Sequence, residues 1–124
     1  MNGTLRQDVH ADLDFDDHLD FPFAYTVNFY LCDTSPANGM TEWWVGTHHR
    51  GNKNIRKLNK RLTPYIIDEE VEKRRKICPP VRPSIPRGSV VIRDLRLWHA
   101  GVPNETTVPR IMFGLVLSLV VKLM

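Results

Sequence analysis

The sequence has few of the features that mark secreted, membrane-spanning or thiolate-metal proteins. Only two cysteines occur, Cys32 and Cys78, and they lack the C-x-x-C spacing of a metal site. The N-terminal stretch MNGTLRQDV contains no apolar signal core. The apolar run from Ile111 to Val121 is well short of the ~20 residues that span a bilayer. We therefore expect free thiols, no membrane span, and an intracellular, cytoplasmic protein.

Charge of neither sign dominates, because 17 basic residues face 14 acidic ones and the net charge is +3. The basic residues gather in 50–61 and 73–76, whereas 8–20 is acidic. A basic patch can bind nucleic acid, but no aromatic stacking pattern accompanies these clusters. We interpret them as solvated surface and expect no nucleic-acid partner. The alternative, nucleic-acid binding, predicts steep salt dependence and no need for a metal.

The length and composition fit one small domain, since 42% of the 124 residues are hydrophobic and 25% are charged. Runs of β-formers predict strands at 7–12, 24–32, 41–45, 90–92 and 111–121, the last one buried. About six strands with non-local pairing indicate a mainly β fold, an antiparallel sandwich or jelly roll. No internal repeat is visible.

One helix is expected between the strands. Thr63 and Pro64 resemble an N-cap and a first helical position, with acids early and the 73–76 cations late in the helix. The stretch 50–62 before it is predicted to be an exposed basic loop with helical turns. Together they form a basic, helical insert at about 50–80 within a single domain that covers 1–124.

The stretch from Ser89 to Arg110 organises the chain. Its apolar run leads into Leu95, Leu97 and His99, which alternation would place on one face of a strand. Arg110 then opens the last apolar run, and a guanidinium can hold a carboxylate with two parallel hydrogen bonds. Taken alone, the residue type of His99 favours a satisfied, half-buried core histidine over a metal ligand.

Two residues near the N-terminus favour a metal-binding role for His99. His10 and Asp12, two positions apart, share a face if 7–12 is extended. Two histidines and one carboxylate form the facial triad of non-haem iron(II) oxygenases, which leaves metal positions open for a cosubstrate and O₂. We therefore expect His10, Asp12 and His99 to bind Fe(II), and Arg110 to anchor the carboxylate of a 2-oxo acid.

Three segments resemble the phytanoyl-CoA dioxygenase family: HAD at 10–12, NFYLCDTSPANGMTEWWVGTHH at 28–49, and GSVVIRDLRLWHAGVPNETTVPR at 88–110. The resemblance implies a double-stranded β-helix, a cupin-like jelly roll, that uses Fe(II), 2-oxoglutarate and O₂. It implies that Arg110 binds the 5-carboxylate of 2-oxoglutarate, with Asn28 and Thr41 beside the same pocket. Such an enzyme couples decarboxylation of 2-oxoglutarate to oxidation of a small organic substrate.

The sequence also departs from the family pattern, because only nine residues precede His10. We therefore expect an N-terminally truncated member with an incomplete jelly roll. Side chains such as Phe29, Leu31, Leu115 and Leu117 would then be exposed and favour self-association. The alternative function is a non-catalytic remnant that keeps the sheet and binds metal weakly or not at all.

Overall fold

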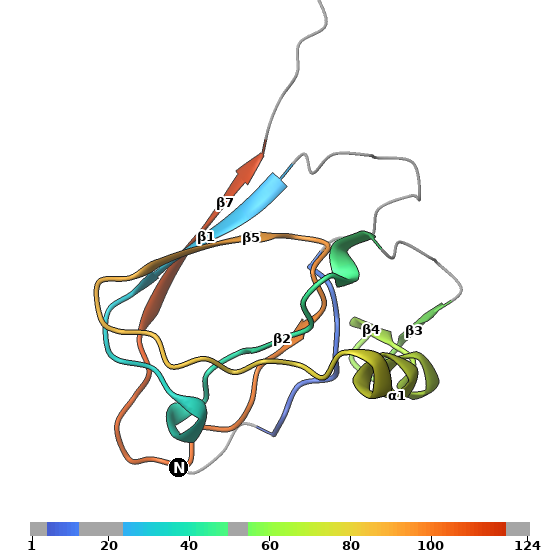
Figure 1. Ribbon diagram of the computed structural model, residues 1–124, viewed down its shortest axis with the longest axis horizontal. Helices are drawn as coiled ribbons and strands as arrows, with labels where there is room; N and C mark the ends of the chain where they lie inside the picture. Colours follow the sequence, from blue (N-terminus) through green and yellow to red (C-terminus); the bar gives the residue numbers. More distant parts are fainter. Residues whose placement is uncertain (1–4, 13–23, 50–54, 119–124) are drawn as a thin grey trace, which may run out of the picture.

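The computed structural model describes residues 5–12, 24–49 and 55–118. Seven strands, one α-helix and two short 3-10 helices occur in these residues (Figure 1). The strands and helices are, in chain order, β1 (Ala24–Tyr30), η1 (Pro36–Asn38), β2 (Glu42–Trp43), η2 (Thr47–His49), β3 (Arg56–Leu58), β4 (Pro64–Ile66), α1 (Asp68–Ile77), β5 (Val90–Asp94), β6 (His99–Ala100) and β7 (Met112–Ser118).

The larger sheet has three antiparallel strands in the order β5–β1–β7. Its central strand, β1, has the sequence AYTVNFY, whose β-branched and aromatic side chains suit a strand paired on both sides. Asn28 lies opposite Val91 on one side and Gly114 on the other, and Thr26 lies opposite Arg93. Cross-strand partners share a face, so this register points Asn28 and Arg93 to the same side of the sheet.

A second sheet of very short segments lies opposite the first (Figure 1). Strands β2 and β6 pair directly, and single bridges add His10 beside His99 and Val81 beside Trp43. Most of its backbone pairing thus joins residues far apart in the chain. The predicted mainly β, antiparallel architecture is confirmed, although the predicted strand at 7–12 is reduced to an extended segment with one bridge.

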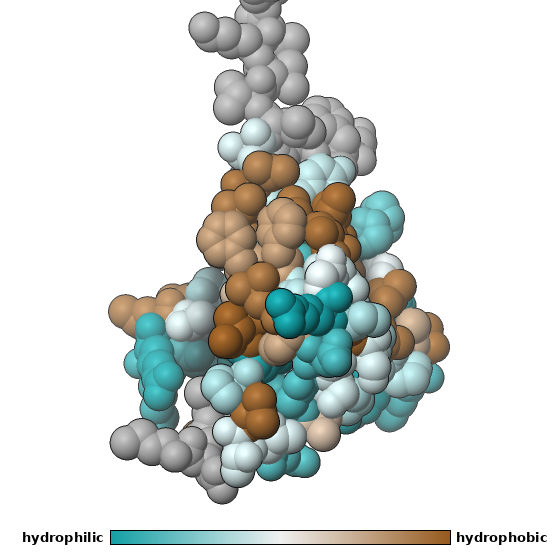
Figure 2. All heavy atoms as spheres, turned by 90° about the vertical axis from the view of Figure 1, so that its left-hand side faces the viewer, coloured by the Kyte–Doolittle hydropathy of each residue, from teal (hydrophilic) through white to brown (hydrophobic). Residues whose placement is uncertain are grey.

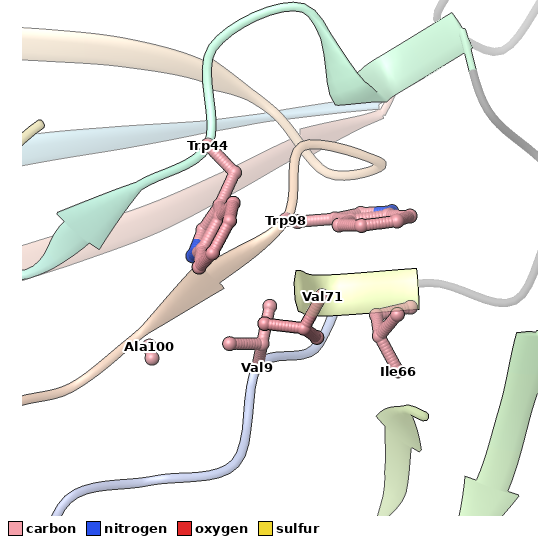
Figure 3. Packing of buried hydrophobic residues seen from close by; sticks show 6 residues of the cluster. All are labelled: Val9, Trp44, Ile66, Val71, Trp98 and Ala100. Carbon is pink, nitrogen blue, oxygen red and sulfur yellow. The ribbon is translucent and has the colours of Figure 1, made fainter. Parts of the chain in front are cut away.

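The main hydrophobic cluster lies between the second sheet and the insert. The indole rings of Trp44 and Trp98 converge with the aliphatic side chains of Val9, Ile66 and Val71 (Figure 3). Both indoles are almost completely buried. Because Val9 and Trp98 belong to this cluster, the segments that carry His10 and His99 are both anchored by apolar packing next to the site.

The insert contains a β-hairpin that the sequence does not predict. Strand β3 pairs with β4, so Pro64 is extended and the helix starts at Asp68 after an Ile67 cap. The predicted helix start at Thr63–Pro64 is therefore wrong, and residues 56–58 form a strand rather than a loop. The helix itself has the predicted acidic first turn and basic last turn. Residues 50–54 lie outside the described residues.

The cations of α1 are largely engaged within the chain. Lys73 pairs with Glu69 and Glu70, and Arg75 pairs with Glu72 while its guanidinium lies 4.9 Å from the centre of the Trp44 ring. Arg74 donates to the carbonyl of Val45. These contacts connect the helix to the second sheet.

Strand β7 is exposed along its whole length. It forms one edge of the larger sheet, and Figure 2 shows hydrophobic side chains gathered over this part of the molecule. The exposed apolar residues of this region are Leu31, Val90, Ile92, Ile111, Met112, Phe113, Leu115, Val116 and Leu117. The expectation of a buried strand here is wrong, whereas the expected exposure of Leu31, Leu115 and Leu117 is confirmed. Phe29 is half-buried, and residues 119–121 are outside the described residues.

The segment between β5 and β6 is a turn and not a continuous strand. The backbone N–H of Leu97 donates to the carbonyl of Asp94, which interrupts the predicted alternation of Leu95, Leu97 and His99. This turn separates the strand of the larger sheet from that of the smaller one. Both cysteines are free thiols, and no helix in the described part of the chain is long and apolar enough to cross a membrane.

Candidate metal centre

The two histidines of the predicted triad are direct backbone partners. The N–H of His10 donates to the carbonyl of His99 at 2.9 Å, and the N–H of His99 donates back at 2.8 Å. Such a reciprocal pair puts both side chains on the same face. Their ring centroids are 4.3 Å apart. The sequence analysis grouped His10 and His99 by their residue types, and the bridge explains how they meet.

Asp12 completes the cluster from the same extended segment as His10. Its backbone N–H donates to the carbonyl of Leu95, and its Oδ1 lies 3.2 Å from Nε2 of His99 and 4.0 Å from Nε2 of His10. One ligand atom from each of the three residues lies within 4.8 Å of the other two. Ligands at right angles around a metal, each ~2.1 Å from it, lie about 3 Å apart. The three groups therefore fit around one ion with little movement.

Both imidazoles are oriented by a carbonyl two residues earlier in the chain. Nδ1 of His10 lies 2.8 Å from the oxygen of Asp8, and Nδ1 of His99 lies 3.0 Å from the oxygen of Leu97. With the ring proton on Nδ1, each ring donates to its carbonyl and leaves the Nε2 lone pair free. This is the arrangement by which proteins orient histidines that bind a metal.

The electrostatics favour the protonation states that a metal requires. Burial lowers the pKa of His10, with the charge of Arg93 acting in the same direction, so the imidazole is neutral at pH 7. Burial alone would raise the pKa of Asp12. The hydrogen bond and charge of His99 and the guanidinium of Arg93 outweigh burial and hold that pKa well below its usual range. His10 thus offers a neutral nitrogen and Asp12 an anionic oxygen.

A cavity of about 400 Å³ opens next to the three ligands. All six residues predicted for the site line it, namely His10, Asp12, Asn28, Thr41, His99 and Arg110. Nη1 of Arg110 is buried there without a hydrogen-bond partner in the described part of the chain. A buried guanidinium nitrogen in this state is costly unless an anion satisfies it. The cavity therefore brings together a possible metal-binding cluster and a buried guanidinium nitrogen that has an unused donor among the described residues.

Arg93 and Tyr30, which also line the cavity, were not assigned to the site from the sequence. Arg93 contacts both Asp12 and His99, at 2.7 Å and 3.0 Å. Tyr30 lines the same cavity, and burial raises the pKa of its phenol, so the hydroxyl is neutral. The sequence does contain a signal for Arg93, which directly follows the apolar run 90–92. A cation that is buried in such a strand needs a charged or polar partner. His48 and His49 line a separate cavity and are not part of the triad.

A comparison with protein-family models matches residues 1–112 to phytanoyl-CoA dioxygenase. The chain belongs to the phytanoyl-CoA dioxygenase family. This match covers the extended segment with His10 and Asp12, both sheets up to Arg110, and the insert. The family indicated by the H-x-D motif and by the spacing from His99 to Arg110 is thereby confirmed.

Solved structures agree with the family match at the level of the fold. A crystal structure of EctD from S. alaskensis with 2-oxoglutarate and 5-hydroxyectoine aligns with a TM-score of 0.71 and 21% identity over 95% of this chain. EctD with bound Fe aligns with a TM-score of 0.68 and 20% identity over 93%. ThoJ, a non-heme monooxygenase in its apo form, aligns with a TM-score of 0.63 and 26% identity over 93%.

The predicted double-stranded β-helix of this family member is thus confirmed. The chain spans only 39% of the length of EctD and 40% of ThoJ.

Proposed function

We propose that this chain carries the Fe(II) and 2-oxoglutarate site of an oxygenase that oxidises a small organic molecule. One observation supports this most strongly. His10, Asp12 and His99 converge in a cavity that is also lined by Arg110, whose Nη1 has no hydrogen-bond partner among the described residues. A structural cluster of core histidines gives no reason for that buried, unsatisfied cation.

Nε2 of His10, Oδ1 of Asp12 and Nε2 of His99 would hold the iron. Two neutral imidazoles and one carboxylate suit Fe(II) and occupy three of its positions. When bound, Fe(II) supplies the activation of O₂ and the decarboxylation of 2-oxoglutarate to succinate and CO₂. The carbonyls of Asp8 and Leu97 would hold the ring proton of each histidine on Nδ1, so that the Nε2 lone pair is available to the metal.

Arg110 would hold the far carboxylate of 2-oxoglutarate through charge-assisted hydrogen bonds. Asn28 and Thr41 line the same cavity and would contact the bound cosubstrate. Neutral Tyr30 can donate its hydroxyl hydrogen at the same side of the cavity, near Arg110. Support for this placement comes from the fold shared with EctD, whose structure contains 2-oxoglutarate.

A second cavity, of about 700 Å³, adjoins the first at His10 and would admit the organic substrate. It shares Leu5, Gln7 and His10 with the first cavity, and Lys60 and Arg61 contribute to its far wall. The identity of that substrate does not follow from these residues.

Calorimetry with Mn(II), a redox-inert stand-in for Fe(II), tests the metal site. We expect near-stoichiometric binding to the unmodified chain and loss of binding in His99→Ala. His49→Ala is the matched control. It removes an exposed imidazole from the separate cavity lined by His48 and His49, and this variant should bind Mn(II) normally. Unchanged affinity after replacement of His10, Asp12 and His99 together would refute the site.

A succinate-release assay with Fe(II) separates the active oxygenase from the non-catalytic alternative. The alternative is favoured by one observation, the exposed apolar face of a chain that spans 39% of EctD. We propose that the 124-residue chain binds metal and 2-oxoglutarate but turns over 2-oxoglutarate slowly. Rapid iron-dependent succinate formation would overturn the proposed slow turnover, and absent metal binding would overturn the function itself.

A further inference from the structure

Arg93 is a buried cation beside the metal centre to which the proposed function assigns no task. It lies on β5 opposite Thr26, and its side chain is only 9% exposed. A charged side chain is seldom buried to this extent without a specific partner. Its guanidinium donates from Nη2 to Oδ2 of Asp12 at 2.7 Å.

The two oxygens of Asp12 are used differently. Oδ1 faces Nε2 of His99 and Nε2 of His10, whereas Oδ2 is the oxygen bound by Arg93. A free carboxylate can bind a metal through one oxygen or through both. The guanidinium competes for Oδ2, so only Oδ1 is directed at the position between the three ligands.

The contact between Arg93 and His99 does not persist in the metal-binding tautomer. Nδ1 of His99 lies 3.0 Å from Nη1 of Arg93 and 3.0 Å from the carbonyl oxygen of Leu97. It can accept from the guanidinium or donate to the carbonyl, but the same nitrogen cannot do both. Because metal binding through Nε2 needs the proton on Nδ1, the bond to Asp12 is the one that Arg93 keeps.

We propose that Arg93 is a positioning residue that holds Asp12 as a one-oxygen ligand and so keeps a third metal position open. This inference rests on the proposed metal site. It adds a physical reason why Asp12 would occupy only one metal position. Arg93 acts through Asp12. The cosubstrate anchor is a different arginine, since Nη1 of Arg110 is unpartnered among the described residues whereas Arg93 is engaged.

The test counts the waters on Mn(II) bound to the chain without 2-oxoglutarate. Paramagnetic relaxation of water protons grows with the number of coordinated waters, and a triad with one-oxygen Asp12 leaves about three positions. Arg93→Met removes the donors and keeps a side chain of similar length. We expect Asp12 to bind through both oxygens in this variant, which lowers the relaxation enhancement by about a third.

Arg96→Met is the matched control, because it removes a half-buried guanidinium that pairs with Asp94. It should leave the relaxation enhancement per bound Mn(II) unchanged. If Arg93→Met loses its cooperative thermal transition, Arg93→Lys takes its place. Its ammonium can still donate to Oδ2, so we expect the water number of the unmodified chain.

The outcomes separate this inference from the function on which it rests. Unchanged relaxation enhancement in a folded Arg93→Met chain, or a lost water in folded Arg93→Lys, overturns the role of Arg93 while the metal site stands. No Mn(II) binding by the unmodified chain overturns both.

Discussion

The hydroxyl of Thr47 accepts the backbone N–H of Trp98 at 2.9 Å and donates to the carbonyl of Trp44 at 2.7 Å. Thr47 is almost completely buried, and it is the middle residue of the G-T-H motif. The Thr47 side chain therefore connects Trp98, which precedes His99, to Trp44, which directly follows β2. Thr47 thus helps to position the backbone next to His99, one of the three proposed metal ligands.

Replacing Thr47 tests this positioning. Thr47→Val keeps the shape but leaves the N–H of Trp98 buried and unpaired, which should destabilise the fold by about 1–3 kcal/mol. Mn(II) affinity should fall as well, because Trp98 precedes His99. Urea denaturation and calorimetry measure the two effects.

Thr34→Val is the matched control, since Thr34 is equally buried but its hydroxyl makes only contacts of 3.3 and 3.5 Å. We expect a smaller loss of stability and normal Mn(II) affinity. Equal losses of affinity in both variants would show that Thr47 contributes only general stability.

Arg110→Ala should weaken 2-oxoglutarate binding to the Mn(II)-loaded chain at least about 30-fold, near 2 kcal/mol, because a buried charge pair is lost. Mn(II) affinity should be unchanged. Arg110→Lys should rescue poorly, since lysine keeps the charge but not the paired donors. Arg87→Ala removes an exposed arginine and serves as the control in the same titration. Joint loss of metal and cosubstrate in Arg110→Ala would instead indicate a role in folding.

Asp94 should contribute to stability in a pH-dependent way. Burial alone would raise its pKa, but hydrogen bonds from the side chain and backbone of Arg96 outweigh burial and hold the pKa below its usual range. A lowered folded-state pKa means that this stabilisation is complete above the unfolded-state value of about 3.9. It is lost as the pH falls through the folded-state pKa.

Urea denaturation of the unmodified chain and of Asp94→Asn at several pH values measures this contribution. Asparagine can still accept the backbone N–H of Arg96 but carries no charge. The stability difference between the two chains should be constant near neutral pH and shrink below about pH 4. A difference that stays constant down to pH 2.5 would contradict the assignment.

The exposed apolar side of β7 should cause the 124-residue chain to self-associate. Phe113, Leu115 and Leu117 are between 41% and 56% exposed, and β7 forms an edge of its sheet that can pair with a second copy. Leu117→Lys should shift size-exclusion elution toward the monomer. Leu58→Lys changes an exposed leucine on β3 and should not. A concentrated, unmodified chain that elutes as a single monomer peak would rule out the association.

The triad could be predicted from residue types and short spacings, but its geometry could not. His10 and Asp12 needed only an extended segment to share a face. That His10 lies directly opposite His99 depends on register between distant segments, which no local pattern contains. Arg93 was missed for a related reason, because its partner Asp12 comes from the other end of the chain.

The errors in the insert and in β7 have different physical causes. Thr63 and Pro64 have the chemistry of a helix start, but Ile66 donates to the carbonyl of Val9 at 2.7 Å and holds the segment extended. Tertiary pairing thus overrides local propensity. The β7 run has the composition of a buried strand. Whether such a strand is buried depends on which other segments pack against it, and the composition of the strand does not determine that.

The bridge between His10 and His99 also sets an order of events during synthesis. His10 leaves the ribosome long before His99, so its segment waits without a partner until most of the chain has followed. The metal centre is therefore among the last features to form. An ion captured there would join the early and late parts of the chain much as a cross-link does, so the supply of iron would help to decide whether the newly made chain stays folded.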